Sequence, residues 1–142
     1  MTTRTRANCQ SMFRAALSPA LHAGSMARHQ EQAHATREIL GLHDEVAFTA
    51  RHFGLAWRMI SRIVELDAYR SFVDEQTSGP FQRFRHTHTF VALEHGCEMT
   101  DDITYQAPVG VVGTVVERLV LTRYLRNLIA QRGHYLASVA GG

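Results

Sequence analysis

The segment Phe81-Gln82-Arg83-Phe84-Arg85-His86-Thr87-His88-Thr89-Phe90 carries more structural information than any other part of this 142-residue chain. Its residues alternate in character, and the side chains of a β-strand point alternately to the two faces of a sheet. One face holds Phe84, His86, His88 and Phe90, whereas the other is cationic and hydroxylic. The pattern therefore predicts a strand whose aromatic face, with its two imidazoles, forms the wall of a pocket.

Other predicted strands add side chains to the same wall. Asp74 and Gln76 share a face with Phe72, and the alternation of Cys97–Gln106 places Met99, Asp101, Ile103 and Tyr105 together. The resulting candidate ligand-binding residues are Phe48, His52, Trp57, Phe72, Asp74, Gln76, Phe84, His86, His88, Phe90, Met99, Asp101, Ile103 and Tyr105. The competing interpretation is that the apolar members of this set are ordinary core residues.

Three interpretations of the pair His86 and His88 remain open. The imidazoles orient a ligand or move protons in a cavity, because histidine titrates near neutral pH. Alternatively, they hold the sheet together by hydrogen bonds, or they bind a metal with Asp74 or Asp101 as a third ligand. If Asp74 faces inward, it needs a partner such as one of these imidazoles, since burying an unpaired charge is costly. An Asp–His pair would be structural or a general base, so His86, His88 and Asp74 are the catalytic candidates. We expect neither a metal nor a cofactor.

Composition limits the possible functions. The formal net charge of +2 is too small to favour a nucleic-acid partner. All 15 basic residues are arginines, so lysine chemistry at a Schiff base or in a phosphate loop is excluded. A chain of 142 residues is long enough for one domain with its own core, and we expect a single domain over residues 1–142.

The cysteines and the hydropathy predict a cytoplasmic protein. The only two cysteines, Cys9 and Cys97, have no context that calls for a disulfide, so we expect reduced thiols. No signal-type apolar core follows the first residues, and no apolar run approaches the ~18 residues of a membrane span.

The order of elements predicts an α+β fold. A short strand at Thr2–Arg6 precedes two short helices, the first capped by Asn8 or Ser11 and the second starting at Ser18-Pro19 and ending near Ala27. Turn residues then separate six strands, so short antiparallel hairpins are expected. These strands are Glu31–Thr36, Asp44–His52, Ala56–Leu66, Ser71–Thr77, Phe81–Leu93 and Cys97–Gln106.

The C-terminal part predicts a long helix after Pro108-Val109-Gly110, which ends the sheet. Its apolar residues do not form one stripe, so we expect a bend near Val120–Thr122 with two packing surfaces. Its arginines and Asn127 are expected to face solvent. A curved sheet with this helix across its open face would leave a space for a pocket.

Several segments in a fixed order resemble a known family. They are Leu40-Gly41-Leu42-His43-Asp44-Glu45-Val46, Ala50-Arg51-His52-Phe53-Gly54, Phe72-Val73-Asp74-Glu75-Gln76, Gly79-Pro80-Phe81, the Phe84–Phe90 strand, Met99-Thr100-Asp101 and Pro108-x-Gly110-x-x-Gly113. Together they resemble the START-like, helix-grip superfamily, and its SRPBCC or polyketide cyclase/dehydrase-like branch in particular, over roughly Phe13 to Leu136.

The resemblance implies a seven-stranded antiparallel sheet that grips the C-terminal helix around a hydrophobic tunnel. Members bind lipids, sterols, polyketides or quinones, and some are cyclases or dehydratases. Thr2–Arg6 departs from the family because it is short and polar, whereas the first strand is usually apolar. A truncated first strand would leave a sheet edge open and favour a homodimer.

Two main functions follow from the sequence. The first is binding of one small apolar or aromatic molecule between sheet and helix. The alternative is an aromatase/cyclase- or dehydratase-like enzyme, in which His86 or His88 takes a proton next to a carbonyl, Asp74 orients the ring, and Tyr105 or an arginine stabilises the enolate. A third possibility is a domain that binds a partner protein.

Overall fold

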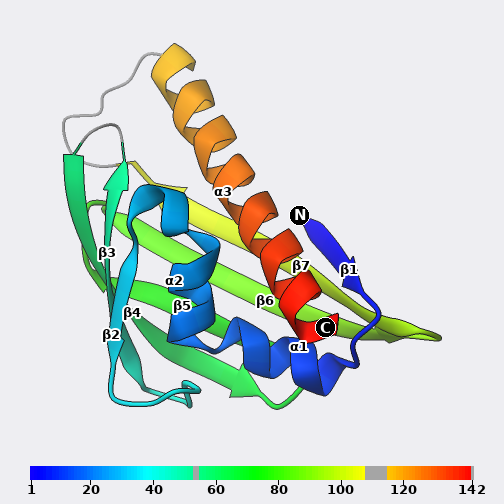
Figure 1. The fold of residues 1–142 in the computed structure, drawn as a ribbon. Coiled ribbons are helices and arrows are strands. Elements are labelled where there is room, and N and C mark those ends of the chain that lie inside the picture. Colours follow the sequence, from blue (N-terminus) through cyan, green and yellow to red (C-terminus); the bar gives the residue numbers. More distant parts are fainter. Residues whose placement is uncertain (53–54, 108–114, 142) are drawn as a thin grey trace.

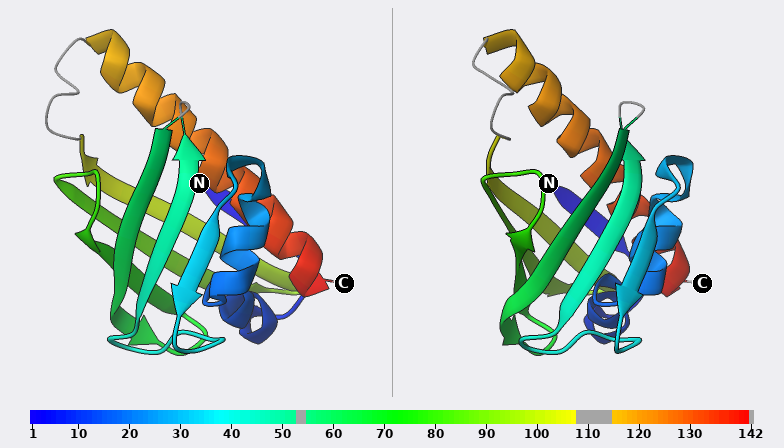
Figure 2. Two further views of the ribbon diagram at one scale, coloured as in Figure 1. Left: turned by 60° about the vertical axis from the view of Figure 1, so that its left-hand side comes forward. Right: turned by 90° about the vertical axis from the view of Figure 1, so that its left-hand side faces the viewer.

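The chain folds into a curved antiparallel sheet that wraps around one long helix (Figures 1 and 2). These features are seen in a computed structural model that describes residues 1–52, 55–107 and 115–141. The strands are β1 (Thr2–Thr5), β2 (Gln32–Ala35), β3 (Glu45–His52), β4 (Leu55–Asp67), β5 (Ser71–Ser78), β6 (Arg83–Leu93) and β7 (Gly96–Gln106). The helices are α1 (Cys9–Ala16), α2 (Pro19–Ser25), the 3-10 turn η1 (Ala27–His29) and α3 (Val115–Gly141).

The sheet has seven strands in the order β1-β7-β6-β5-β4-β3-β2, and every neighbouring pair is antiparallel. Strands β2 to β7 follow one another as consecutive neighbours, while β1 pairs with β7 and forms one edge. Helices α1 and α2 lie on the same concave side as α3 (Figure 1). The predicted α+β helix-grip architecture is confirmed.

The two short helices begin where their capping residues predict. Asn8 Oδ1 accepts a hydrogen bond from the Ser11 amide at 2.8 Å, and Ser18 Oγ accepts one from the Leu21 amide at 3.2 Å. Pro19 occupies the first turn of α2, where its missing N–H has no cost. Helix α2 ends at Ser25, slightly earlier than predicted.

Helix α3 is continuous through Val120–Thr122, so the predicted bend is wrong (Figure 1). The apolar residues that face the sheet form one stripe at helical spacing, namely Leu121, Tyr124, Leu125, Leu128 and Ile129. Leu119 and Val120 are exposed, so the helix needs no second packing surface at this point. The glycine motif between Pro108 and Gly113 lies outside the described residues.

Cys9 and Cys97 form a disulfide, so the prediction of reduced thiols is wrong. Their sulfur atoms are 1.98 Å apart, although 88 positions separate them in sequence. Helix α1 packs against β6 and β7, and this packing brings the two residues together. The bond ties the start of α1 to the β7 side of the sheet.

The packed core occupies the end of the sheet that α1 covers. Phe13 of α1 makes edge-on contacts with Phe72 and Phe90, with ring centroids 5.6 and 5.2 Å apart. Met99 and Leu136 are fully buried in the same cluster. Because α1 fills this end, the space between the sheet and α3 lies towards the other end of the sheet.

None of the described helices is long and apolar enough to cross a membrane.

Candidate functional site

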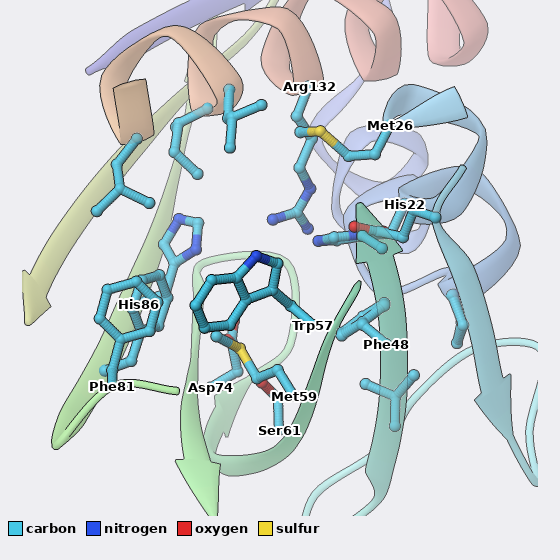
Figure 3. A pocket seen from close by; sticks show the side chains of 18 of the residues that line it. His22, Met26, Phe48, Trp57, Met59, Ser61, Asp74, Phe81, His86 and Arg132 are labelled. Carbon is cyan, nitrogen blue, oxygen red and sulfur yellow. The ribbon is translucent and has the colours of Figure 1, made fainter. Parts of the chain in front are cut away.

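A cavity of about 520 Å³ lies between the concave face of the sheet and α3 (Figure 3). This volume is within the ~300–1,000 Å³ range of small-molecule sites. Most of its wall is apolar, with Phe48, Trp57, Met59 and Ile63 from the sheet and the apolar stripe of α3 opposite. Polar side chains enter it at a few points only.

Seven of the fourteen predicted ligand-binding residues line this cavity. They are Phe48, His52, Trp57, Phe72, Asp74, Phe84 and His86. Trp57 near the start of β4 is hydrogen-bonded to His52 at the end of β3, because the Trp57 indole N–H donates to the His52 carbonyl oxygen at 2.9 Å.

The other seven residues lie outside the cavity lining. Phe90 and Met99 belong to the packed core beneath α1. Gln76 holds the following turn, donating to the Phe81 carbonyl at 2.7 Å and accepting from its amide at 3.2 Å. The Tyr105 hydroxyl lies 2.6 Å from the Thr122 hydroxyl. The remaining three are His88, Asp101 and Ile103, of which the first two are buried behind His86.

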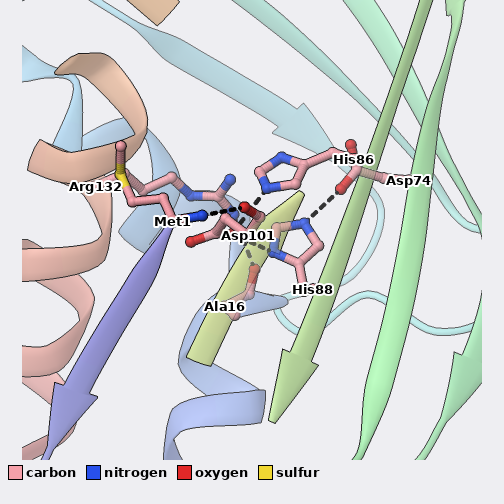
Figure 4. Close-up of polar contacts among 7 residues, drawn as sticks. All are labelled: Met1, Ala16, Asp74, His86, His88, Asp101 and Arg132. Atoms are coloured by element: carbon pink, nitrogen blue, oxygen red, sulfur yellow. Dashed lines mark hydrogen bonds and ion pairs between the residues drawn. The ribbon is translucent and has the colours of Figure 1, made fainter. Parts of the chain in front are cut away.

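Asp74, which is partly buried, and the buried residues His88, Asp101 and His86 form a continuous polar chain along the cavity wall (Figure 4). His88 Nε2 lies 2.8 Å from Asp74 Oδ2, and His88 Nδ1 lies 3.0 Å from Asp101 Oδ1. The same Asp101 oxygen is 2.8 Å from His86 Nε2. The two imidazoles are stacked, with ring centroids 3.7 Å apart. The chain therefore runs Asp74–His88–Asp101–His86 and ends at the cavity.

The pKa shifts assign a charge to each member of this chain. Burial opposes ionisation of Asp74, but the hydrogen bond from His88 and the nearby His86 outweigh it and lower the pKa of Asp74 to about 2. Burial also opposes ionisation of Asp101, yet hydrogen bonds from both imidazoles hold its pKa well below the usual range. Burial alone would lower the pKa of His88, but hydrogen bonds to Asp101 and Asp74 raise it overall. His88 is thus an imidazolium between two carboxylates.

His86 is the neutral member of the chain. Burial and the positive charge of His88 lower its pKa to about 4, despite the hydrogen bond to Asp101. Because Asp101 is ionised and only accepts, the proton of neutral His86 sits on Nε2 and Nδ1 keeps a lone pair. Among the described residues, none donates a hydrogen bond to His86 Nδ1. The polar chain therefore places a neutral imidazole at the cavity, and this imidazole is fixed in the tautomer that carries its proton on Nε2.

Arg132 of α3 also lines the cavity, and the prediction that the arginines of α3 face solvent is wrong for this residue. Only 7% of its surface is exposed. Its Nη2 donates to the Ala16 carbonyl oxygen at 3.3 Å, while its Nε is buried without a partner. Sequence reasoning missed Arg132, although it lies three residues after Ile129 and four after Leu128, on the same helix face.

Two further histidines line the cavity, and each makes a close contact with a polar side chain. His22 Nδ1 lies 2.5 Å from Glu31 Oε1, and burial followed by the charge of Arg132 lowers the pKa of His22. His52 Nδ1 lies 2.7 Å from the Tyr124 hydroxyl. Burial, together with nearby His29, lowers the pKa of His52.

Donor atoms of Asp74, His86 and His88 lie within 4.8 Å of one another, which is close enough for a shared metal ion. However, Nε2 of each histidine already makes a 2.8 Å contact with a carboxylate. A metal would have to replace these hydrogen bonds.

Solved structures share this fold at low sequence identity. The protein TTHA0849 from Thermus thermophilus superposes with a TM-score of 0.78 at 15% identity, over 98% of this chain and 96% of that one. The Zhui aromatase/cyclase from Streptomyces sp. R1128 gives 0.76 at 14% identity, over 99% and 90%. Ginseng major latex-like protein 151 from Panax ginseng gives 0.65 at 14% identity, over 96% and 95%.

No protein-family model and no curated protein sequence matches this chain. Strand order, the gripped helix and these superpositions agree with one another and with the resemblance in the sequence. The chain therefore has the helix-grip fold that these solved structures share.

Proposed function

We propose that this protein binds one small hydrophobic or aromatic molecule, of lipid, polyketide or quinone type, in the cavity between the sheet and α3. The observation that carries the proposal is the cavity of about 520 Å³ with a mainly apolar wall. An apolar molecule that fills the cavity would remove apolar surface of the wall from water. Each Å² of apolar surface removed in this way stabilises the complex by about 25 cal/mol. The fold of a ligand-binding superfamily supports the same function.

The neutral fluorescent probe 1-N-phenylnaphthylamine tests this proposal, because its emission rises when it leaves water. We expect saturable binding at one site per chain. A Leu128→Trp variant would fill the cavity with a larger side chain and weaken binding at least tenfold. Leu119→Trp is the matched control on the same helix, since Leu119 is 64% exposed. Equal binding by both variants would place the probe outside the cavity and refute the proposal.

A second candidate function is acid–base catalysis of the cyclase or dehydratase kind. The position of His86 on the cavity wall favours it, because neutral Nδ1 is a base that points away from the carboxylate chain. Two other candidates have less support, because His88 is buried between two carboxylates that raise its pKa and Tyr105 does not line the cavity. A pKa of about 4 makes His86 a weak base at pH 7. Binding is therefore our first proposal.

Deuterium exchange next to a carbonyl tests the catalytic candidate. If His86 removes such a proton, the protein in D₂O would accelerate deuterium uptake by 2-tetralone, and a His86→Gln variant would not. Mass spectrometry of the recovered ketone measures the uptake. Exchange at the buffer rate with wild-type protein would rule out this chemistry for ketones of this size.

Two predictions from the sequence concern the protein's surroundings. A homodimer would form through the edge strand β1, which has only four residues, and light scattering after gel filtration measures the mass of the particle.

A cytoplasmic location stays a prediction, and the disulfide counts against it because reducing compartments rarely keep disulfides. Alkylation of free thiols during cell lysis reports the state of Cys9 and Cys97.

A further inference from the structure

Arg132 is short of hydrogen-bond acceptors inside the cavity. A guanidinium has five N–H groups, and among the described residues Arg132 donates only one hydrogen bond, to the Ala16 carbonyl. No described carboxylate lies within ion-pair distance of it, and its Nε is buried without a partner. Figure 3 shows the guanidinium reaching from α3 into the space above Trp57 and beside His22. Water or a bound molecule in the cavity can supply the missing acceptors, and a bound molecule that does so gains hydrogen bonds from a buried cation.

The charges around Arg132 indicate what kind of acceptor fits. Two carboxylates and one imidazolium give the polar chain along the cavity wall a net charge of −1, and the positive charge of Arg132 acts on Asp74 within it. The cation is thus already offset in charge while its N–H groups remain unpaired. Asp74 and Glu31 also line the cavity and would repel a further negative charge.

We propose that Arg132 recognises a neutral carbonyl oxygen on the ligand, so that the protein selects apolar ring ketones or quinones over hydrocarbons and over carboxylates. This inference rests on the proposed function and adds the side chain, Arg132, that recognises the polar group of the ligand. The carbonyl would accept hydrogen bonds from the guanidinium, while the apolar wall takes up the rings. Neutral His86 and neutral His22 add no charge that would favour an anion.

Three tricyclic compounds of one skeleton test the proposal: fluorene, 9-fluorenone and 9-fluorenecarboxylate. Each competes with 1-N-phenylnaphthylamine for the wild-type protein. We expect fluorenone to bind about 10- to 100-fold more tightly than fluorene, as expected for a hydrogen bond from a charged donor. The carboxylate should bind no more tightly than fluorene. Equal affinity of fluorene and fluorenone, or tightest binding of the carboxylate, would overturn the proposal.

Variants on α3 show whether Arg132 is the donor. Arg132→Met should reduce the preference for fluorenone to within about threefold and change the affinity for fluorene little. Arg132→Gln keeps N–H donors without the charge and should retain part of the preference. Arg126→Met is the control, because Arg126 is exposed on the same helix. A full preference in Arg132→Met would refute the assignment.

The outcomes separate this inference from the proposed function. If fluorene and fluorenone both displace the probe equally, binding in the cavity stands and the role of Arg132 falls. If the probe itself does not bind to the wild-type protein, the proposed function falls as well. Should Arg132→Met fail to fold, as judged by near-ultraviolet circular dichroism, the wild-type comparison and Arg132→Gln decide.

Discussion

Replacing His86 with glutamine should remove a large part of the acid sensitivity of the protein. In the folded state the pKa of His86 is about 4, whereas the unperturbed value is 6.5. Between these two values the unfolded chain binds a proton at this position and the folded chain does not. The free energy of unfolding therefore falls as the pH is lowered from about 6.5 to about 4.

The size of the effect follows from that difference. One pKa unit corresponds to about 1.4 kcal/mol, so protonation of this one residue in the unfolded state costs the fold about 3 kcal/mol at pH 4. This is a large part of the ~5–15 kcal/mol that stabilises a typical domain. A glutamine at position 86 does not titrate, and its side-chain amide can still donate to Asp101.

Urea unfolding at a series of pH values from 4 to 8, followed by circular dichroism, measures the effect. Between pH 4.5 and 6.5 the slope for wild-type protein should exceed that of His86→Gln by close to one proton. The lowered pKa of His22 contributes to the slope in both proteins and cancels in the comparison. Above pH 6.5 the raised pKa of His88 acts in the opposite direction, since its contribution is lost as the pH rises. Identical slopes in the acid range would refute the assignment of neutral His86.

Three further experiments test the packing around the site, each by urea unfolding of variants. Converting Cys9 and Cys97 to serine should lower the free energy of unfolding by about 4 kcal/mol, because the disulfide closes a loop spanning 88 positions; an unchanged stability would mean that the disulfide does not form. His88→Leu leaves buried Asp101 and partly buried Asp74 without their cation and should cost about 3–5 kcal/mol, whereas a loss below about 1 kcal/mol would contradict the polar chain. Gly133→Ala should destabilise by about 1–3 kcal/mol, because its Cβ would overlap Thr3 Oγ1, and adding Thr3→Ala should restore stability; a more stable Gly133→Ala protein would contradict this contact.

The pairing of the site residues could be predicted from strand alternation. Residues that share a face in three consecutive strands meet across the hairpins, so Asp74 lies opposite His86 and Asp101 opposite His88. Strand alternation does not predict where along the sheet the packed core ends and the cavity begins. Phe90 lies on the same face as His86, yet it is packed under α1, because Phe13 fills that end.

Other features depend on contacts that sequence spacing does not reveal. The disulfide forms because α1 folds back onto β7, which joins positions far apart in the chain. Arg132 continues the apolar stripe of α3, so the helix face on which it lies could be predicted. Its charge, however, favoured a solvent-exposed position. The structure buries it because the polar chain and the Ala16 carbonyl compensate the guanidinium.

Ligand binding in this protein requires a hollow interior that admits an apolar molecule beside His86. Isotope-filtered nuclear Overhauser spectra of the protein saturated with 1-N-phenylnaphthylamine test it most directly. We predict contacts from the probe to methyl groups of Ile63, Leu128 and Ile129, which line the cavity. Contacts only to exposed residues such as Val91 or Leu119 would show that the probe sits on the outer surface and would contradict the account.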